Sequence, residues 1–433
     1  MDWPLVLLCF FAALFALMLT GLPVFVAFLV VNLGGLLLLV GPRGFGLFAN
    51  SVFDSLTTSA FAAIPLFLLM GEILFRSGSV EVLFDSVDRM IGRLRGRLYL
   101  VVIALSTVFG ALSGSAVAVA ALLGRSALPT MTARGYDKRL SSGVILAGAS
   151  LAPIIPPSLL AIIVGSLADV SIAGLLIAGI IPGIVLAALT AGWVSLSVLR
   201  RPDAAPPTDA GGEAQGSILG ALARMLPFLL IILAVMGLIV LGIATPSESA
   251  ATGVLGAIAV AAIYRRLSVG MLLDALGSAT RISAMILVIV AASKLFSQLL
   301  AFTGATRALV AWSAGLGLDP LVMFALMMLV PFVLCMFLDQ VAFLLMAVPL
   351  YSPLVAALGF DPIWFWTLFL INLTLGSVTP PFGYTLFALI GAAPQVGLGT
   401  VFRASLPVIA IFLAGMALFT LAPGLVTWLP SAL

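Results

Sequence analysis

The sequence predicts an all-α polytopic membrane protein, with about ten transmembrane helices and two re-entrant helical hairpins in two inverted-topology repeats. Three observations predict this class. Of the 433 residues, 63% are hydrophobic and only 8% are charged, and the mean hydropathy is +1.32. Apolar runs long enough to cross a bilayer recur along the whole chain. Landmark residues also recur at one spacing in the two halves.

The composition argues against several classes of site. The sequence has no histidine, and its two cysteines, Cys9 and Cys335, both lie in apolar segments. We therefore expect no disulfide framework, no transition-metal site, no His-based catalytic arrangement and no organic cofactor. The net charge of +3 gives no indication of nucleic-acid binding. The first apolar run follows Asp2 instead of a basic segment, so we expect a retained helix and not a signal peptide.

The spans follow from the apolar runs. They are predicted near residues 4–19, 21–41, 60–76, 141–163, 172–199, 217–245, 248–264, 282–303, 363–390 and 404–428. Two further apolar segments are interrupted in the middle: residues 98–128 by Ser113-Gly114-Ser115, and residues 321–352 by Asp339-Gln340. Residues 200–216 form a polar linker that divides the chain nearly in half.

The two halves share a register. Pro129 lies six residues before a Gly-aromatic-Asp triplet and twenty-seven before Pro156-Pro157, and Pro353 has the same spacing to a second triplet and to Pro380-Pro381. The offset between the two series is 224 residues. The sequence therefore predicts a first repeat over residues 1–199 and a second over residues 217–433.

Basic residues predict the orientation of each half. They flank both ends of the first interrupted segment, whereas almost none flank the second after Arg307. By the positive-inside rule the ends of the first segment are cytoplasmic and those of the second face outward, with a periplasmic N-terminus; Arg43 is the exception among short loops. A segment of about thirty residues that enters and returns on one side is a hairpin of two half-length helices.

A binding site is predicted where the hairpin tips meet the double prolines. Ser115 and Asp339 align in the repeat, and an isolated carboxylate in hydrocarbon costs several kcal/mol. Asp339 therefore either binds a cation or lies at an aqueous mouth or helix N-terminus. Prolines remove backbone donors and leave upstream carbonyls free for a monovalent cation. The carbonyls in question belong to Ala152, Ile155, Gly376, Val378 and Thr379.

These motifs together resemble a known family. They are Ala63-Ile-Pro-Leu-Phe67, Gly71-Glu-Ile-Leu74, Phe109-Gly-Ala-Leu-Ser-Gly-Ser-Ala116, Arg134-Gly-Tyr-Asp137, Pro153-Ile-Ile-Pro-Pro-Ser158 and Gly376-Ser-Val-Thr-Pro-Pro-Phe-Gly383. The chain resembles the large membrane (M) subunit, DctM-like, of tripartite ATP-independent periplasmic (TRAP) transporters, in the ion transporter superfamily. The resemblance implies an elevator-type secondary transporter of the bacterial inner membrane. It would import a solute, usually an organic acid, with sodium ions, together with a periplasmic substrate-binding protein (P) and a small four-helix membrane subunit (Q).

The resemblance also implies roles for particular residues. Sodium ligands would come from Ser113, Ser115 and Pro156 in the first half, and from Asp339, Gly376, Val378, Thr379 and Pro381 in the second, with their division between sites left open. Gly114, Ser158 and Lys294 are the candidates for substrate binding. Residues 1–97 and 217–307 would form a scaffold, residues 98–199 and 308–433 a transport part, and an interfacial helix over residues 82–94 an arm between them.

Four charged or small side chains complete these expectations. Lys294 either forms a structural ion pair or attracts an anionic substrate. We expect Arg125 at the cytoplasmic end of the first hairpin's second arm, and Glu72 as a structural carboxylate beside Arg76. Arg125, Lys294 and Ala152 all depart from the family's pattern, which has small residues at the first two positions and Gly at the third.

Three other functions compete with this interpretation. A sodium-coupled carboxylate symporter with similar hairpins would need no binding protein. A channel would show a continuous polar stripe or a charged ring, and the sequence has neither. An intramembrane enzyme would need a nucleophile with a base or a set of metal ligands, so we do not expect an enzyme.

Overall fold

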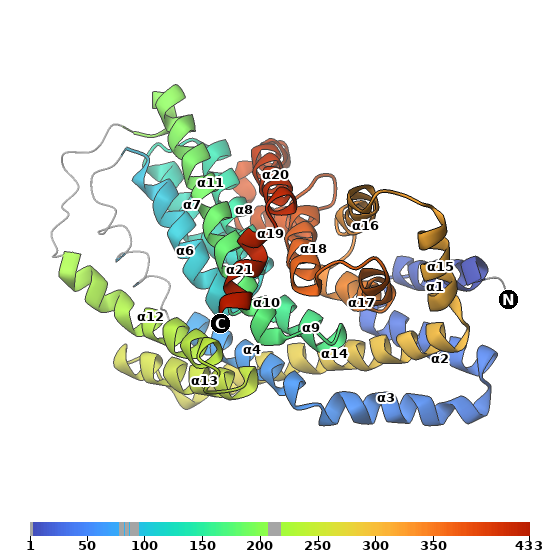
Figure 1. The fold of residues 1–433 in the computed structure, drawn as a ribbon. Helices are drawn as coiled ribbons and strands as arrows, with labels where there is room; N and C mark the ends of the chain where they lie inside the picture. Colours follow the sequence, from blue (N-terminus) through green and yellow to red (C-terminus); the bar gives the residue numbers. More distant parts are fainter. Residues whose placement is uncertain (1–2, 78–81, 83–85, 87–94, 207–217) are drawn as a thin grey trace.

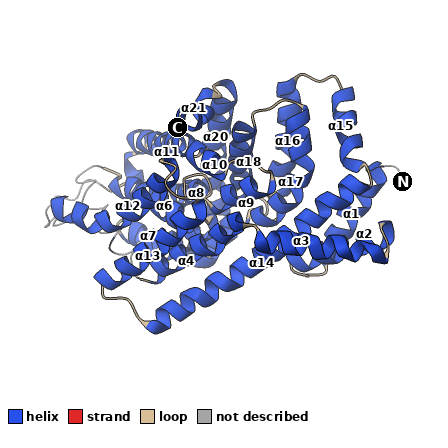
Figure 2. Ribbon diagram, turned by 60° about the horizontal axis from the view of Figure 1, so that its bottom comes forward, coloured by secondary structure: helices blue, strands red, loops and turns tan. Residues whose placement is uncertain are grey.

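The computed structural model describes residues 3–77, 82, 86, 95–206 and 218–433, and within these every regular element is a helix (Figures 1 and 2). Eight of the described helices are long and apolar enough to cross a membrane, and five shorter ones are also apolar. The predicted all-α class is therefore confirmed. The predicted interfacial helix, apart from residues 82 and 86, and residues 207–216 of the linker lie outside the described residues.

One set of helices, which we call the first group, comes from the start of each half. Its members are α1 (Trp3–Leu19), α2 (Val24–Leu39), α3 (Phe45–Thr57), α4 (Ala63–Arg76), α12 (Ile218–Val240), α13 (Pro246–Ile263), α14 (Val269–Phe302) and α15 (Ala305–Gly315). Helix α14 packs on α2, α3 and α4, and it runs beside α3 in Figure 1. Polar contacts join them: Asn32 Nδ2 donates to Ala292 O (3.0 Å), and Ser51 Oγ donates to Gln298 Oε1 (3.0 Å). Such bonds link helices where no water competes.

The remaining helices form a second group. They are α6 (Arg97–Ser113), α7 (Ala116–Ala133), α8 (Lys138–Leu151), α9 (Leu159–Leu167), α10 (Ile172–Ala178), α11 (Ile180–Arg200), α16 (Pro320–Leu334), α17 (Gln340–Ala357), α18 (Pro362–Ser377), α19 (Tyr384–Ala392), α20 (Leu398–Leu421) and α21 (Gly424–Ala432). The two halves of the chain interlock here, because α7 packs on α19 and α8 on α20. Gly124 permits the first contact, since a Cβ there would lie 2.9 Å from Ala392 Cβ.

The helix starts reproduce the predicted repeat. Helices α7 and α17 begin 224 residues apart, and so do α8 and α18. The caps recur as well: Asp137 Oδ1 accepts from Leu140 N (2.7 Å) at the start of α8, and Asp361 Oδ1 accepts from Trp364 N (2.8 Å) at the start of α18. In both halves a break at the double proline separates this helix from the next. The repeat is therefore present in the structure as well as in the sequence.

Several predicted boundaries were wrong. The span predicted over residues 282–303 is the end of a 34-residue helix, α14, about 51 Å long. Asp274 and Arg281 interrupt the apolar run without interrupting the helix, because Ala275 and Ala279 between them are buried by packing. Helix α3 carries Asn, Ser and Asp and shows no span signal, and it was missed, as was α15. The hairpin arms have 15 to 18 residues, close to half of the interrupted segments predicted over residues 98–128 and 321–352.

Candidate functional site

The tip of the first hairpin lies directly on the break in the helix that follows it. Gly114 ends α6 with a φ of 60°, a conformation that favours glycine. A Cβ on Gly114 would lie 3.2 Å from Leu159 N, the first residue of α9. One turn earlier in α6, a Cβ on Gly110 would lie 2.7 Å from Ala152 Cα. Two glycines thus bring the tip residues Ser113 and Ser115 close to the Pro156-Pro157 break.

The first break spans residues 152–158 and is almost entirely buried. Pro156 and Pro157 have no N–H, so the carbonyls of Ala152 and Pro153 lose their helical donors. The Ser158 hydroxyl donates to Pro153 O (2.5 Å) and accepts from Ala161 N (3.3 Å), which caps α9. Among the described residues no hydrogen bond reaches the carbonyls of Ala152 or Ile155. These two oxygens were predicted to be free, and none of the described residues donates to them.

The second break, residues 378–383, is built differently. Pro380 and Pro381 remove the helical donors of Gly376 O and Ser377 O. Gly376 O accepts from Thr379 N (3.1 Å), and Thr379 O accepts from Gly383 N (3.1 Å), so these two predicted ligands are partly used. Val378 O receives no hydrogen bond within the described chain. Thr379 Oγ1 donates to Leu375 O (2.7 Å), which leaves the lone pairs of the hydroxyl as acceptors.

The second hairpin tip packs on this second break. A Cβ on Gly376 would lie 2.6 Å from Cys335 Cβ, so α18 approaches the end of α16 as closely as glycine allows. The rings of Phe337 and Phe382 lie 5.3 Å apart. Each tip therefore meets the double proline of its own half. The structure thus places each hairpin tip beside the break of its own half, and how the implied sodium ligands divide between sites stays a prediction.

Asp339 occupies the N-cap of α17. Its Oδ1 accepts from Val341 N (3.0 Å) and Ala342 N (3.2 Å), and its side chain is exposed. The contact with a helix N-terminus, one of the two predicted interpretations, is thus present. Both bonds reach the same oxygen, so Oδ2 is not used by the cap. Ser115 holds the aligned position on α7, where its hydroxyl accepts from Ala118 N (3.3 Å).

Lys294 has no acidic partner among the described residues, so the structural ion pair suggested by the sequence is not seen. Its Nζ lies 5.4 Å from the centre of the Phe61 ring, in the 3-10 turn η2 (Ser59–Ala62). The neighbouring Ser293 hydroxyl donates to Leu345 O of α17, where the first group meets the second hairpin. The half-buried cation therefore lies over Phe61, and the residue beside it in α14 joins the two groups.

Two other charges can now be placed. Glu72 Oε2 lies 3.0 Å from Arg76 Nε, so the predicted structural pairing is confirmed. Arg125 was expected at a helix end, but it lies in the middle of α7, eight residues before Ala133. That position is about 12 Å from the last carbonyls of the helix, so Arg125 does not satisfy them. The expectation failed because α7 continues past Pro129 to Ala133.

Sequence reasoning missed a chain of buried hydroxyls beside the second break. Thr385 Oγ1 donates to Ser377 Oγ (3.1 Å), which donates to Thr374 O (2.8 Å). The side chains of Thr374, Ser377 and Thr385 are all fully buried. The available signal was the spacing of Thr374 and Ser377, one turn apart, immediately before the double proline.

The comparisons with known proteins bear on this arrangement. The model of the tripartite ATP-independent periplasmic transporter family, DctM component, matches residues 11–425. The chain belongs to this family. It is a large permease subunit of a TRAP transporter and a multi-pass membrane protein, not an enzyme, and the resemblance drawn from the motifs is confirmed.

Three similar proteins illustrate the family and fold. The chain is 28% identical to the C4-dicarboxylate TRAP transporter large permease DctM of Pseudomonas aeruginosa, over 91% of this chain and 92% of that one. It is 29% identical to the ectoine TRAP transporter large permease TeaC of Halomonas elongata, over 96% and 97%. The crystal structure of the YdaH transporter of Alcanivorax borkumensis superposes with a TM-score of 0.66 at 16% identity, covering 90% of each chain. This last likeness concerns the fold alone.

Gly110→Ala tests the packing of the first tip. The added methyl group would meet the backbone of Ala152, so we expect a loss of about 1–3 kcal/mol in stability. Gly192→Ala in α11 is the matched control, because a Cβ there has no neighbour within 4 Å. Thermal unfolding of the purified protein in detergent would show the difference, and equal midpoints for the two variants would contradict this account.

A second pair of substitutions separates the cap of α17 from the charge of Asp339. Asp339→Ala removes the cap and should cost about 1 kcal/mol of stability, whereas Asp339→Asn keeps an oxygen that caps the helix equally well. In sodium-free buffer we expect a lower unfolding midpoint for the alanine variant only. Equal destabilisation by both changes would mean that the charge, not the cap, stabilises the tip.

Proposed function

We propose that this permease imports a small organic acid together with sodium ions by an elevator mechanism, receiving its solute from a periplasmic binding protein. The observation that carries the proposal is the contact of each hairpin tip with the double proline of its own half. Broken helices that meet in this way expose backbone oxygens and helix ends near mid-membrane, where secondary transporters bind ions and substrate.

Sodium is the ion that these oxygens fit best. Hydroxyls and carbonyls are neutral, hard ligands, and Asp339 Oδ2 adds one negative charge at the second tip. We assign Ser113, Ser115 and Pro156 to ligands of the first break. To the second break we assign the side chains of Asp339 and Thr379 and the backbone of Gly376, Val378 and Pro381. The capping requirement at the first tip is met by a neutral serine, so the carboxylate at the second tip serves another purpose.

The solute would bind between the two sodium sites as an anion. Lys294 supports this, because it adjoins Ser293, which joins the two groups, and has no carboxylate partner in the described chain. Gly114 and Ser158 complete the proposed substrate contacts, with Gly114 at the first tip and Ser158 at the start of α9. The related permeases named for C4-dicarboxylate and ectoine make an organic acid the first class of solute to test.

The two groups of helices suit an elevator. In the proposal residues 1–97 and 217–307, which hold the first group except most of α15, are the scaffold, and residues 98–199 and 308–433 are the transport part. The two groups meet where α4 packs on α6 and α9, and where α14 and α15 pack on α17. The small four-helix membrane subunit would complete the fixed scaffold in the inner membrane, with the N-terminus of this chain periplasmic.

Sodium binding can be tested without knowing the solute. A ligand at about one hundred times its dissociation constant stabilises the folded state by about 2.7 kcal/mol. We therefore expect the unfolding midpoint to rise when sodium chloride replaces choline chloride, and Asp339→Asn to reduce that rise strongly. Asp361→Asn is the matched control, because Asp361 caps α18 through the same kind of bond away from the tip. A sodium-induced shift that Asp339→Asn leaves intact would refute the assigned site.

Lys294→Gln tests the proposed anion contact. In proteoliposomes that contain this chain, a small membrane subunit and a loaded binding protein, we expect the half-saturating solute concentration to rise about tenfold, or about 1.4 kcal/mol. Lys294→Arg should restore most of the affinity, and Arg281→Gln on the same helix is the control. Equal kinetics for Lys294→Gln and the unmodified protein would exclude a role in binding.

The same vesicles distinguish the transporter classes. Uptake that requires the binding protein and an inward sodium gradient is expected. Uptake that proceeds with sodium but without the binding protein would support the binding-protein-independent carboxylate symporter. Uptake unaffected by removal of sodium would overturn the coupling mechanism, whichever solute is carried.

A further inference from the structure

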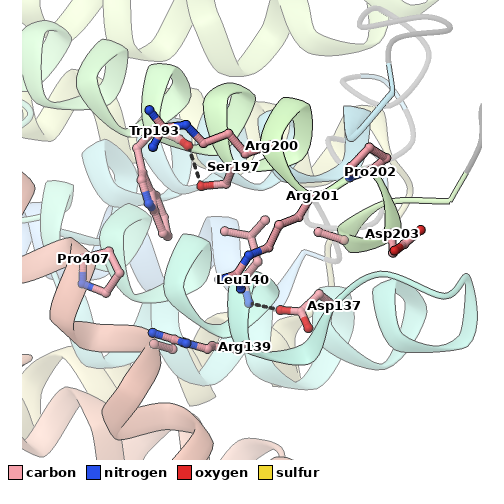
Figure 3. A pocket seen from close by; sticks show the side chains of 12 residues that line it. Asp137, Arg139, Leu140, Trp193, Ser197, Arg200, Arg201, Pro202, Asp203 and Pro407 are labelled. Carbon is pink, nitrogen blue, oxygen red and sulfur yellow. Dashed lines mark hydrogen bonds between the residues drawn. The ribbon is translucent and has the colours of Figure 1, made fainter.

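A pocket of about 600 Å³ lies outside the proposed transport site, where the end of α11 meets the starts of α8 and α20 (Figure 3). The 3-10 turn η3 (Pro202–Ala204) forms its rim. The lining side chains are mainly basic, aromatic and apolar; they include Arg139, Arg200, Arg201, Trp193, Leu140 and Pro407. None of these residues takes part in the hairpin tips or the double-proline breaks. The pocket therefore needs an explanation of its own.

The charge of the pocket favours an anion. Three arginines line it against two carboxylates, Asp137 and Asp203. Asp137 already uses Oδ1 to cap α8, through Leu140 N at 2.7 Å. None of the three arginines forms an ion pair with any residue that the structure describes. In Figure 3 Arg201 extends from the end of α11 towards Leu140, and Arg200 lies beside Trp193.

The walls are held in place by specific contacts. Tyr99 Oη donates to Ala204 O (2.6 Å), and Arg95 Nη2 donates to Pro202 O (2.6 Å), so the rim is fixed to α6. Gly143 makes room for the indole of Trp193, because a Cβ there would lie 3.0 Å from Trp193 Cη2 and from Ala404 O. Pro407, which also lines the pocket, removes a helical donor in α20. The hollow is therefore part of the packing of three helices.

The surroundings of the pocket point to a lipid as the source of the anion. Leu196 and Leu199 of α11 are 45% and 77% exposed, and Leu406 of α20 is 56% exposed, so apolar side chains continue from the pocket along the outer faces of both helices. Trp193 lies two turns before Arg200, and Trp is enriched at the level of lipid headgroups. A free phosphate would use the arginines but not the apolar faces beside them.

We propose that this pocket binds the phosphate of an anionic phospholipid, with the acyl chains along α11 and α20. Arginine recognises phosphate through paired N–H groups, and basic pockets between membrane helices at the cytoplasmic side bind anionic headgroups. The pocket lies in the second group of helices, so the lipid would belong to the part that moves in the proposed elevator. The binding itself does not depend on the transport proposal.

Native mass spectrometry of the detergent-purified full chain tests the assignment. Titrated with phosphatidylglycerol and with phosphatidylcholine of the same acyl chains, the protein should bind the anionic lipid about tenfold more tightly. The double variant Arg200→Gln/Arg201→Gln should lose this preference. The matched control, Arg265→Gln/Arg266→Gln, removes the same charge from another exposed arginine pair and should keep it. An unfolding midpoint equal to that of the unmodified protein verifies that both variants are folded.

A second measurement locates the lipid without changing the charge. Phosphatidylglycerol brominated on its acyl chains quenches nearby tryptophans, so in bilayers the quenching should fall when Trp193→Phe removes the indole. Three outcomes would overturn the proposal. In the first, the protein binds phosphatidylglycerol and phosphatidylcholine equally well. In the second, both double variants lose the preference for phosphatidylglycerol to the same extent. In the third, inorganic phosphate binds in a way that needs the arginines but displaces no lipid.

Discussion

A backbone amide or carbonyl in the membrane has to find its partner within the protein, and the rest of this structure depends on that constraint. Single prolines within the helices each remove one donor, but the double prolines Pro156-Pro157 and Pro380-Pro381 each remove two and interrupt the helix. The local repairs are specific: Ser158 donates to Pro153 O, and Thr379 N donates to Gly376 O. Within the part of the chain that the structure describes, no hydrogen bond reaches Ala152 O or Val378 O, and a hairpin tip packs on each of the two breaks that hold them. Irregular backbone is tolerated here because another part of the same chain covers it.

Close approach of backbones holds both covering tips, and a contact between the Phe337 and Phe382 rings is added at the second. Gly110 and Gly114 bring the first tip onto Ala152 and Leu159, and Gly376 brings α18 onto the end of α16. The glycine lies on the hairpin in the first half and on the broken helix in the second. The two halves thus reach the same contact with different residues. The repeat therefore keeps the arrangement of the helices, while the residues that let them pack differ between the halves.

The sequence predicted what local chemistry decides and missed what tertiary structure decides. The double prolines, the caps at Asp137 and Asp361 and the 224-residue register are local patterns, so the breaks and the repeat could be predicted. Helix α14 was not, because Asp274 and Arg281 resemble loop residues until packing covers their neighbours. The position of Arg125 depended on α7 continuing past Pro129. The pocket at Arg200 and Trp193 joins three helices from both halves, and no spacing in the sequence indicates it.

The aligned tips also show where the two halves have diverged in chemistry. Ser115 and Asp339 both cap the helix that follows, so capping alone does not require a carboxylate at either place. At the proposed mid-membrane position an ionised carboxylate would cost about 2.5–3.5 kcal/mol, whereas a charge at a helix N-terminus gains about 0.3–1 kcal/mol. The cap would then offset only part of the cost, and a cation on Oδ2 of the exposed Asp339 side chain would offset the remainder. A neutral serine at the first tip incurs no such cost, so the proposal needs a negative charge at only one of the two sites.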